Sequence, residues 1–325
     1  SLGNSPDPIE LFEKYGTDAT RFSIMLMSPQ GSDVYFSENG LEIGRNFMNK
    51  IWNASRFIMI NHDESFSDTL DKDSLDIYDK WILAKLDTTL EKVDVHYGNY
   101  QFNEAIKVIY DFTWNEFCNW YIEIAKIKFN SSNKTEKNNA FLVSKEVLKK
   151  VLLILHPIAP FITEEIWSYL KNETDEDIII SSWPKFRTKG LQYDNDKVLS
   201  MKEVVVAIRT IRSELNVPPT KKINASIAIK NAEDASLFHS LKSMIMDLTN
   251  LEELKIEINL EKPEQSAVGI CKNCVVYIPL GDLVDSKEEI LKLNKRLKDI
   301  EGFIDGIKTK LKNKAFTDKA PEKIV

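Results

Sequence analysis

The residues best suited to chemistry fall on one face of a predicted helix near the start of the chain. At 100° per residue, Arg45, Asn49, Trp52, Asn53 and Arg56 cluster opposite an apolar face. A guanidinium can pair with a phosphate or stack on a base, an amide can pair with base edges, and an indole can stack. This face therefore suits single-stranded RNA. An ordinary solvated helix face with one helix–helix salt bridge has the same composition.

A second group of candidates lies on a predicted helix from about Phe102 to Phe129. Trp120 falls in its apolar stripe and is assigned to the core, whereas Trp114 and Tyr121 fall outside the centre of the stripe and are candidates for stacking. Further polar residues of this helix are candidates for contacts with base edges or phosphates: Asn115, Glu116, Asn119, Lys126 and Lys128.

Three other sites have a possible functional interpretation, but an ordinary structural interpretation is favoured for each. Arg209 and Arg212 stand three apart on a predicted helix, where a surface ion pair competes with a phosphate contact. Cys271 and Cys274 have no second cysteine pair to complete a zinc site, so we expect them to flank a turn. His156 precedes a proline and is expected to mark a helix end.

Composition excludes several protein classes. The 325 residues are 43% hydrophobic and 29% charged, which indicates a folded protein, and no run of about 20 apolar residues could span a membrane. Three cysteines do not make a disulfide framework. The net charge of −7 argues against a general nucleic-acid binder. Residues 286–325, however, carry ten Lys and one Arg against seven acids, a local charge of +4, so contact with a polyanion must be local.

The elements that must position the candidate residues are mostly helices. One glycine, Gly98, occurs between Gly44 and Gly190, which favours packed helices. Apolar periodicity predicts helices over about 41–60, 77–95, 102–129 and 141–155, with a further helix that begins at Pro160 and a loop over 130–139. Antiparallel helices joined by polar loops make a helical bundle.

A different pattern begins near Trp183. Helical segments at about 196–215 and 232–248 alternate with strand-like segments at 223–230 and 254–260, and a hairpin is predicted with a two-residue turn at 272–273. These elements indicate a small α/β unit. The predicted fold class is therefore mainly α, with a helical bundle, a small α/β unit and a C-terminal coiled-coil helix.

That last helix carries an apolar seam with heptad spacing from Ile290 to Leu311. A seam of this kind needs a partner helix, which a second segment or another molecule must supply. Lysines flank it, and they fit either a solvated coiled-coil surface or a surface that attracts a polyanion: Lys292, Lys295, Lys298, Lys308 and Lys312.

Several segments, in order along the chain, resemble the valyl-tRNA synthetases, a family of class I aminoacyl-tRNA synthetases. The opening SLGN is similar to the tail of the KMSKS loop, with Ser1 as its last serine, and residues 8–25 resemble the segment that follows that loop. RNFMNKIWNASRF, FTWNEFCNWYIEIAK and LHPIAPFITEEIW resemble the helical anticodon-binding domain. The heptad helix followed by AFTDKAPEKIV resembles the valyl-type arm.

The resemblance implies a division into a joining segment (1–39), an anticodon-binding domain (40–187), an α/β unit (188–285) and the first helix of a tRNA-binding arm (286–325). It implies a monomeric cytoplasmic parent enzyme that uses ATP with Mg to attach valine to tRNA(Val), with no membrane or DNA partner. We expect this region alone to bind no cofactor or metal and to be inactive. The implied tRNA contacts are Arg45, Asn46, Asn49, Lys50, Trp52, Asn53, Arg56, Trp114, Glu116, Asn119 and Lys126.

Two alternatives stay open. The same segments also fit isoleucyl- or leucyl-tRNA synthetases, because only the KAP-containing end points to the valyl type. The second alternative is a non-enzymatic helical interaction module whose heptad seam binds a partner helix.

Overall fold

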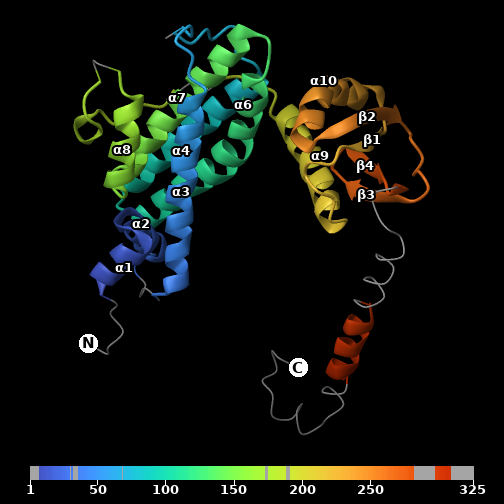
Figure 1. Cartoon of the computed structure of the whole chain (residues 1–325), viewed down its shortest axis with the longest axis horizontal. Coiled ribbons are helices and arrows are strands. Elements are labelled where there is room, and N and C mark those ends of the chain that lie inside the picture. Colours follow the sequence, from blue (N-terminus) through green and yellow to red (C-terminus); the bar gives the residue numbers. More distant parts are fainter. Residues whose placement is uncertain are drawn as a thin grey trace. The chain divides into compact units, whose positions relative to one another are not determined.

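The chain divides into two units, Ser1–Leu199 and Ser200–Val325, which are described separately. The computed structural model describes residues 7–29, 31, 36–67, 69–172, 175–187, 191–281 and 297–308. The first unit is built of helices and the second contains a small sheet (Figure 1), so the predicted mainly α fold with a small α/β part is confirmed. Within the described ranges, no helix has both the length and the apolar character needed to cross a bilayer.

The first unit is a succession of helices joined by connections of different lengths. Its π-helix is labelled η1 and its 3₁₀ turn η2. The elements are α1 (Pro8–Tyr15), α2 (Thr17–Met27), α3 (Glu38–Ile60), α4 (Ile77–Gly98), α5 (Phe102–Asp111), η1 (Phe112–Tyr121), α6 (Ile122–Phe129), α7 (Lys134–Leu155), α8 (Pro160–Leu170) and η2 (Ile178–Ile180).

Helix α2 packs closely on α3 because Gly44 has no side chain. A Cβ at Gly44 would collide with the Ala19 carbonyl oxygen, and next to this point the rings of Phe22 and Phe47 stack with their centroids 4.6 Å apart. The apolar face predicted for this helix is buried, as expected: Phe47, Met48, Ile51, Ala54, Ser55 and Ile58. Burial of that face directs the opposite, polar face of α3 outward.

Helix α2 also holds the start of α8. Both carboxylate oxygens of Asp18 accept backbone N–H groups from the first turn of α8, at 3.4 Å from Phe161 and 2.6 Å from Ile162. One turn later, the Arg21 guanidinium donates to the carbonyl of Ile158 (2.9 Å). Asp18 therefore acts as a helix cap supplied from a distant part of the sequence. The predicted start of this helix at Pro160 is confirmed.

One predicted loop is mostly helix. Residues 130–139 were expected to be a loop, but α7 begins at Lys134. The Asn133 side chain accepts the N–H groups of Thr135 (3.0 Å) and Glu136 (3.3 Å), so it caps the helix and moves its start forward by two turns. The other end agrees with expectation, because His156 is the C-cap and its Nδ1 lies 2.7 Å from Thr163 Oγ1.

The predicted helix over 102–129 is helical throughout, but its middle third is the π-helix η1. A π-helix bonds i to i+5, so each residue turns the chain by less than 100° and the buried stripe changes phase. Trp120, assigned to the core, is only half-buried, whereas Tyr121 is fully buried. Lys128 is likewise 1% exposed. The expectations that Tyr121 stacks on a ligand and that Lys128 contacts phosphate are therefore wrong.

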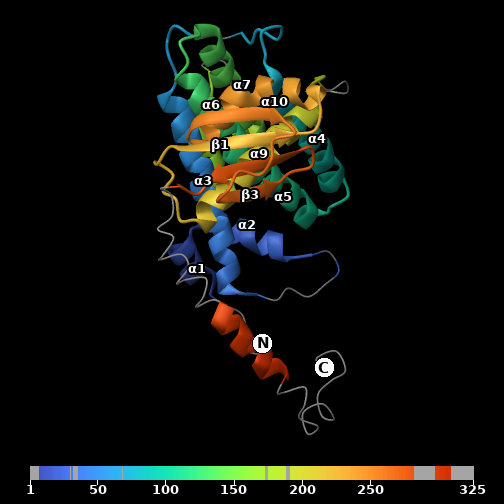
Figure 2. The same ribbon diagram turned by 90° about the vertical axis from the view of Figure 1, so that its right-hand side faces the viewer.

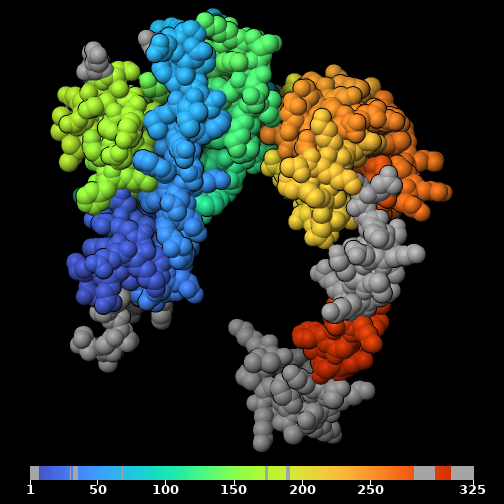
Figure 3. All heavy atoms as spheres, viewed as in Figure 1, coloured from blue at the N-terminus to red at the C-terminus, as the bar shows by residue number. Residues whose placement is uncertain are grey.

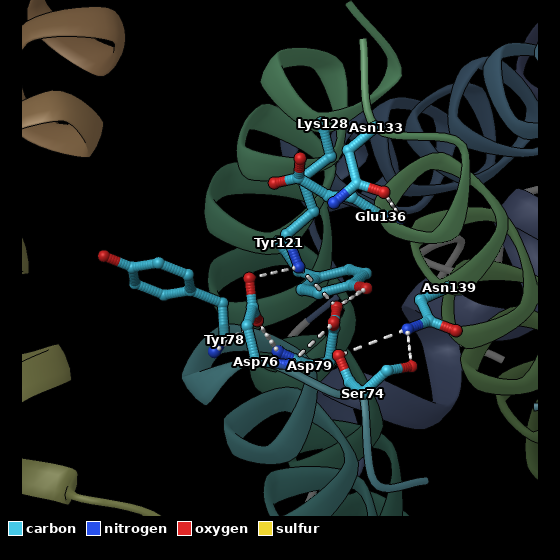
Figure 4. A network of polar contacts seen from close by, with 9 residues as sticks. All are labelled: Ser74, Asp76, Tyr78, Asp79, Tyr121, Lys128, Asn133, Glu136 and Asn139. Carbon is cyan, nitrogen blue, oxygen red and sulfur yellow. Dashed lines mark hydrogen bonds and ion pairs between the residues drawn. The ribbon is translucent and has the colours of Figure 1, made fainter. Parts of the chain in front are cut away.

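Tyr121 and Lys128 meet a buried carboxylate at the start of α4 (Figure 4). Lys128 Nζ lies 2.7 Å from both Asp79 Oδ1 and Asp76 Oδ2, and the Tyr121 hydroxyl donates to Asp79 Oδ1 at 2.6 Å. Asp76 and Asp79 also form the capping box of α4. Burial, together with the neighbouring Asp79, raises the pKa of the Tyr121 phenol well above its usual value. The network thus fixes η1 and α6 against the start of α4.

In the second unit, a four-stranded sheet has the strand order β2-β1-β4-β3. Strands β1 and β2 are parallel and are joined by α10, whereas β4 pairs antiparallel with β1 and β3. Figure 2 looks onto the strands. The elements are α9 (Asn195–Glu214), which begins in the first unit, β1 (Ile223–Ile229), α10 (Ala232–Thr249), β2 (Leu251–Ile258), β3 (Ser266–Ile270) and β4 (Cys274–Pro279).

One face of the sheet carries the core of the second unit. Ile227, Leu254 and Val276 point to this face and are fully buried. A Cβ on Gly269 of β3 would lie 3.0 Å from Ala207 of α9, so the helix packs directly on this edge strand. The predicted hairpin is confirmed: β3 and β4 pair up to Ile270 and Val275, and the turn lies at 272–273 as expected.

The predicted heptad helix is described only over residues 297–308, which are helical. Its apolar seam residues in this range, Leu297, Ile300, Ile304 and Ile307, are all exposed. The remaining positions of the seam lie outside the described residues.

Candidate nucleic-acid interface

The outward face of α3 presents cations, amides and an indole to solvent. Its backbone is a regular helix from Glu38, and the apolar stripe on the opposite side fixes its rotation. Trp52 is 39% exposed although it is a large aromatic residue. In Figure 3, α3 forms a blue ridge on the visible surface of the first unit. The predicted residues that are exposed here are Arg45, Asn46, Asn49, Trp52, Asn53 and Arg56.

Lys50 and Trp114 connect α3 with η1. The Lys50 ammonium lies 5.3 Å from the centre of the Trp114 ring, and both side chains are half-buried. The Trp114 indole also stacks on Tyr110, with centroids 5.6 Å apart and an interplanar angle of 14°. Tyr110 in turn contacts Phe47 in the core, at 5.1 Å. Contacts within the protein therefore fix the position of the indole. A base that stacks on it must use the part of the ring that Tyr110 and Lys50 do not cover.

Lys126 joins the same two parts of the bundle further along. Its ammonium lies 5.7 Å from the centre of the Phe57 ring on α3 and 2.7 Å from Glu123 Oε1. Phe57 packs against Phe129, with centroids 5.7 Å apart. The candidate residues on α3 and those on η1 and α6, which lie about sixty residues later in the sequence, thus meet where these helices pack together.

Carboxylates one helical turn away pair with two of the predicted cations. Arg45 lies 2.5 Å from Glu42, and Lys126 pairs with Glu123 as described above. All four side chains are between 37% and 47% exposed, and pairs of this kind contribute about 1 kcal/mol or less. A phosphate can therefore compete with these carboxylates for the cations.

The remaining candidates on η1 differ in their exposure to solvent. Asn119 and Glu116 are half-buried, and Asn115 is exposed. Two aromatic rings that support the surface, Tyr110 and Phe57, were not among the predicted residues. The spacing of Tyr110 and Trp114, one α-helical turn apart, is the signal that could have identified the stack.

Of two cavities in the first unit, the smaller one borders this face and the larger one does not. One, of about 330 Å³, is lined by Arg45 and Asn49 together with Asp18 and Phe161. The other, of about 720 Å³, is mainly apolar and is lined by residues of α2, α4 and α5 with Trp183. None of the predicted interface residues lines the larger cavity. In the described part of the chain, no three His, Cys, Asp or Glu side chains come together as a metal site would require.

Arg209 and Arg212 hold protein carbonyl groups in the second unit. Arg212 is 6% exposed and donates to the carbonyls of Thr249 (3.2 Å), Pro218 (2.6 Å) and Lys221 (2.7 Å). Burial lowers the pKa of its guanidinium. The expectation of a surface ion pair or phosphate contact is therefore wrong for Arg212. Arg209 donates to the Leu248 carbonyl at 3.0 Å.

The arm lysines are described only in part. Lys298 and Lys308 lie within the helix 297–308 and are exposed. Lys292, Lys295 and Lys312 lie outside the described residues.

Comparison with known families identifies two segments. Residues 79–229 match the anticodon-binding domain of tRNA ligases, and residues 285–325 match the valyl tRNA synthetase tRNA binding arm. The first match covers most of the bundle, including η1 and Lys126, and begins after α3.

Known proteins are similar over the whole chain. The valine–tRNA ligase of Fusobacterium nucleatum subsp. nucleatum is 38% identical over 100% of this chain, and that of Clostridium tetani is also 38% identical over 100%. The chain spans 37% of the length of each of these relatives. A solved LeuRS–tRNA–LeuAMS complex from Agrobacterium radiobacter K84 is 18% identical, with a TM-score of 0.45 over 68% of this chain and 29% of that one.

Proposed function

Because this chain belongs to the valyl-tRNA synthetase family, we propose that its helical bundle recognises the anticodon region of a tRNA and positions that tRNA for aminoacylation. The observation that carries the proposal is the exposed face of α3, where cations, amides and Trp52 face solvent together. Recognition of single-stranded RNA needs these groups, because splayed bases stack on aromatic rings and pair through their edges.

The proposed contacts divide into two kinds. Arg45, Arg56, Lys50 and Lys126 hold phosphates, which fixes the position of the RNA without reading its sequence. Trp52 and Trp114 stack on bases, while the amides and one carboxylate read base edges: Asn46, Asn49, Asn53, Asn119 and Glu116.

For the whole protein, we propose the activity of its relatives. It would attach valine to tRNA(Val) with ATP and Mg, as a cytoplasmic monomer, in a catalytic part that this chain does not include. Residues 1–39 would join that part to the anticodon-binding domain at 40–187. The α/β unit at 188–285 would lead into the arm at 286–325. Arm lysines such as Lys298 and Lys308 would add salt-sensitive attraction to the tRNA backbone.

Filter binding with purified tRNAs of valine, isoleucine and leucine, at about 50 and 200 mM salt, tests this proposal. We expect the valine tRNA to bind most tightly. Three or four phosphate contacts would lower the affinity roughly 20- to 150-fold between the two salt concentrations. Tightest binding of another tRNA would overturn the valine assignment. Self-association without tRNA binding would instead favour an interaction module built on the exposed seam at 297–308.

A further inference from the structure

We propose that Cys271 and Cys274 form a redox-active dithiol, a modification site at the tip of the β3–β4 hairpin that closes reversibly to an intrachain disulfide. The site belongs to the second unit and does not depend on the function proposed for the bundle. It takes a low-molecular-weight disulfide, such as glutathione disulfide, as its oxidant. Both cysteines are free thiols in this structure.

The backbone of the hairpin sets the two cysteines at a distance that a disulfide can span. They flank the two-residue turn, and the Cys271 N–H donates to the Cys274 carbonyl at 3.0 Å. Opposed residues that share such a bond in an antiparallel pair have Cα atoms about 5.5 Å apart. Disulfides form at Cα separations of about 4.4–6.8 Å. The Cα separation is therefore within the range of a disulfide, and closure requires rotation of the side chains together with an adjustment of the turn that brings the two Cβ atoms closer.

The two thiols influence each other's ionisation. Interaction with Cys274 lowers the pKa of Cys271, and interaction with Cys271, together with burial, raises the pKa of Cys274. Cys271 is half-buried at the turn, whereas Cys274 is buried on β4. The accessible thiol is thus the one that ionises first, and the protected thiol lies directly opposite it across the turn. This is the arrangement of an attacking and a resolving cysteine.

The turn is held in place by helix α9. Glu203 Oε2 accepts the backbone N–H of Lys272 at 3.1 Å, which anchors the turn between the two cysteines. The same carboxylate raises the pKa of Cys271, because its negative charge disfavours the thiolate. Glu203 therefore restrains the reactivity of the pair while it preserves the geometry.

The reaction balances in two exchange steps. The Cys271 thiolate attacks one sulfur of glutathione disulfide and releases one glutathione thiolate, which leaves a mixed disulfide on Cys271. Cys274 then gives up its proton to solvent, attacks the Cys271 sulfur and releases the second glutathione. The protein loses two electrons and two protons, and glutathione disulfide is reduced to two thiols.

The experiment uses the full 325-residue chain in glutathione buffers of increasing oxidised fraction, followed by alkylation and peptide mapping by mass spectrometry. We expect a linked peptide pair containing Cys271 and Cys274, reversible with dithiothreitol. Cys118, which is 3% exposed, should stay a free thiol and serves as the internal control. A stable glutathione adduct on wild-type Cys271, a disulfide-linked dimer, or two unmodified thiols throughout the series would each overturn the proposal.

Single variants separate the two roles. Cys274→Ser should trap glutathione on Cys271, because the resolving thiol is gone, and Cys271→Ser should leave Cys274 unmodified. Glu203→Gln keeps an oxygen acceptor for Lys272 and removes the charge, so alkylation of Cys271 at neutral pH should become faster. Equal modification of Cys271 and Cys274 in their single variants, or slower alkylation in Glu203→Gln, would contradict the assigned roles.

Discussion

The cations along α3 and α6 are held in two different ways. Arg45 and Lys126 each pair with a carboxylate one turn away, in exposed pairs that a phosphate can replace at little cost. Lys50 instead lies over the Trp114 ring, which is itself stacked on Tyr110. Lys50 is thus positioned before any ligand arrives, and it loses less side-chain freedom on binding.

Arg45→Ala and Trp52→Ala should each weaken tRNA binding. Loss of a stacking contact at Trp52 costs about 1–3 kcal/mol, which corresponds to a roughly 5- to 150-fold weaker affinity. The matched control for Arg45 is Lys107→Ala, because Lys107 forms the same kind of exposed i, i+3 pair with Glu104 on α5. Filter binding measures all three variants. Unchanged affinity in Arg45→Ala and Trp52→Ala, with intact circular dichroism, would remove this face from the interface.

At the scale of elements, the buried faces and the ends of the helices could be predicted wherever apolar residues repeat with the α-helical period. The apolar face of α3, the end of α7 at His156 and the start of α8 at Pro160 all follow from spacing and proline. The prediction failed at Tyr121 and Lys128, because a 3.6-residue period was carried through a π-helix. A π-helix, with hydrogen bonds from i to i+5, cannot be recognised from the apolar pattern before the buried positions have already shifted.

Lys128→Met should destabilise the first unit by about 3–5 kcal/mol, because it leaves the buried Asp79 carboxylate without the cation that pairs with it. All six tryptophans lie in the first unit, so their fluorescence during urea unfolding reports on that unit. Lys126→Met, two positions away in an exposed pair, is the control and should change stability by about 1 kcal/mol or less. Similar losses in both variants would contradict a special role for the buried pair.

Asp18 gives the bundle a dependence on pH. Burial raises the pKa of its carboxyl above 3.8, so the folded state binds a proton more tightly than the unfolded chain does. The contribution of Asp18 is therefore greatest below pH 3.8 and declines as pH rises through the folded pKa. The Asp18→Asn variant keeps an acceptor for the Ile162 N–H. As pH rises from 3.8 through the folded pKa, the wild type should lose stability relative to this variant. Urea unfolding at a series of pH values checks this, and a gain for the wild type would show that hydrogen bonds to the carboxylate outweigh its burial.

At the scale of the whole molecule, charge is unevenly distributed. The chain carries −7 overall, but residues 286–325 carry +4, so the other 285 residues sum to −11. An anionic protein that binds a polyanion must do so through local cationic surfaces. Repulsion from the rest of the protein then disfavours binding of the polyanion in other orientations. The proposed interface on α3 and the arm lysines fit this requirement. Which bases are read cannot be predicted from sequence, because amides such as Asn49 and Asn53 suit several base edges.

The π-helix η1 also bears on how this chain tolerates insertions and deletions. It winds surplus residues into the bundle, and the buried stripe downstream is shifted by about one position. Loss of one residue there would let a regular α-helix replace the wider turns and still keep Tyr121 and Lys128 on the buried side, because the lost residue cancels the shift. The Lys128 ammonium would then keep its contacts with Asp76 and Asp79 in a regular α-helix. A one-residue deletion in η1 should thus be tolerated, whereas a regular α-helix of unchanged length would turn Trp120 and Ile127 to the buried side and Lys128 to solvent.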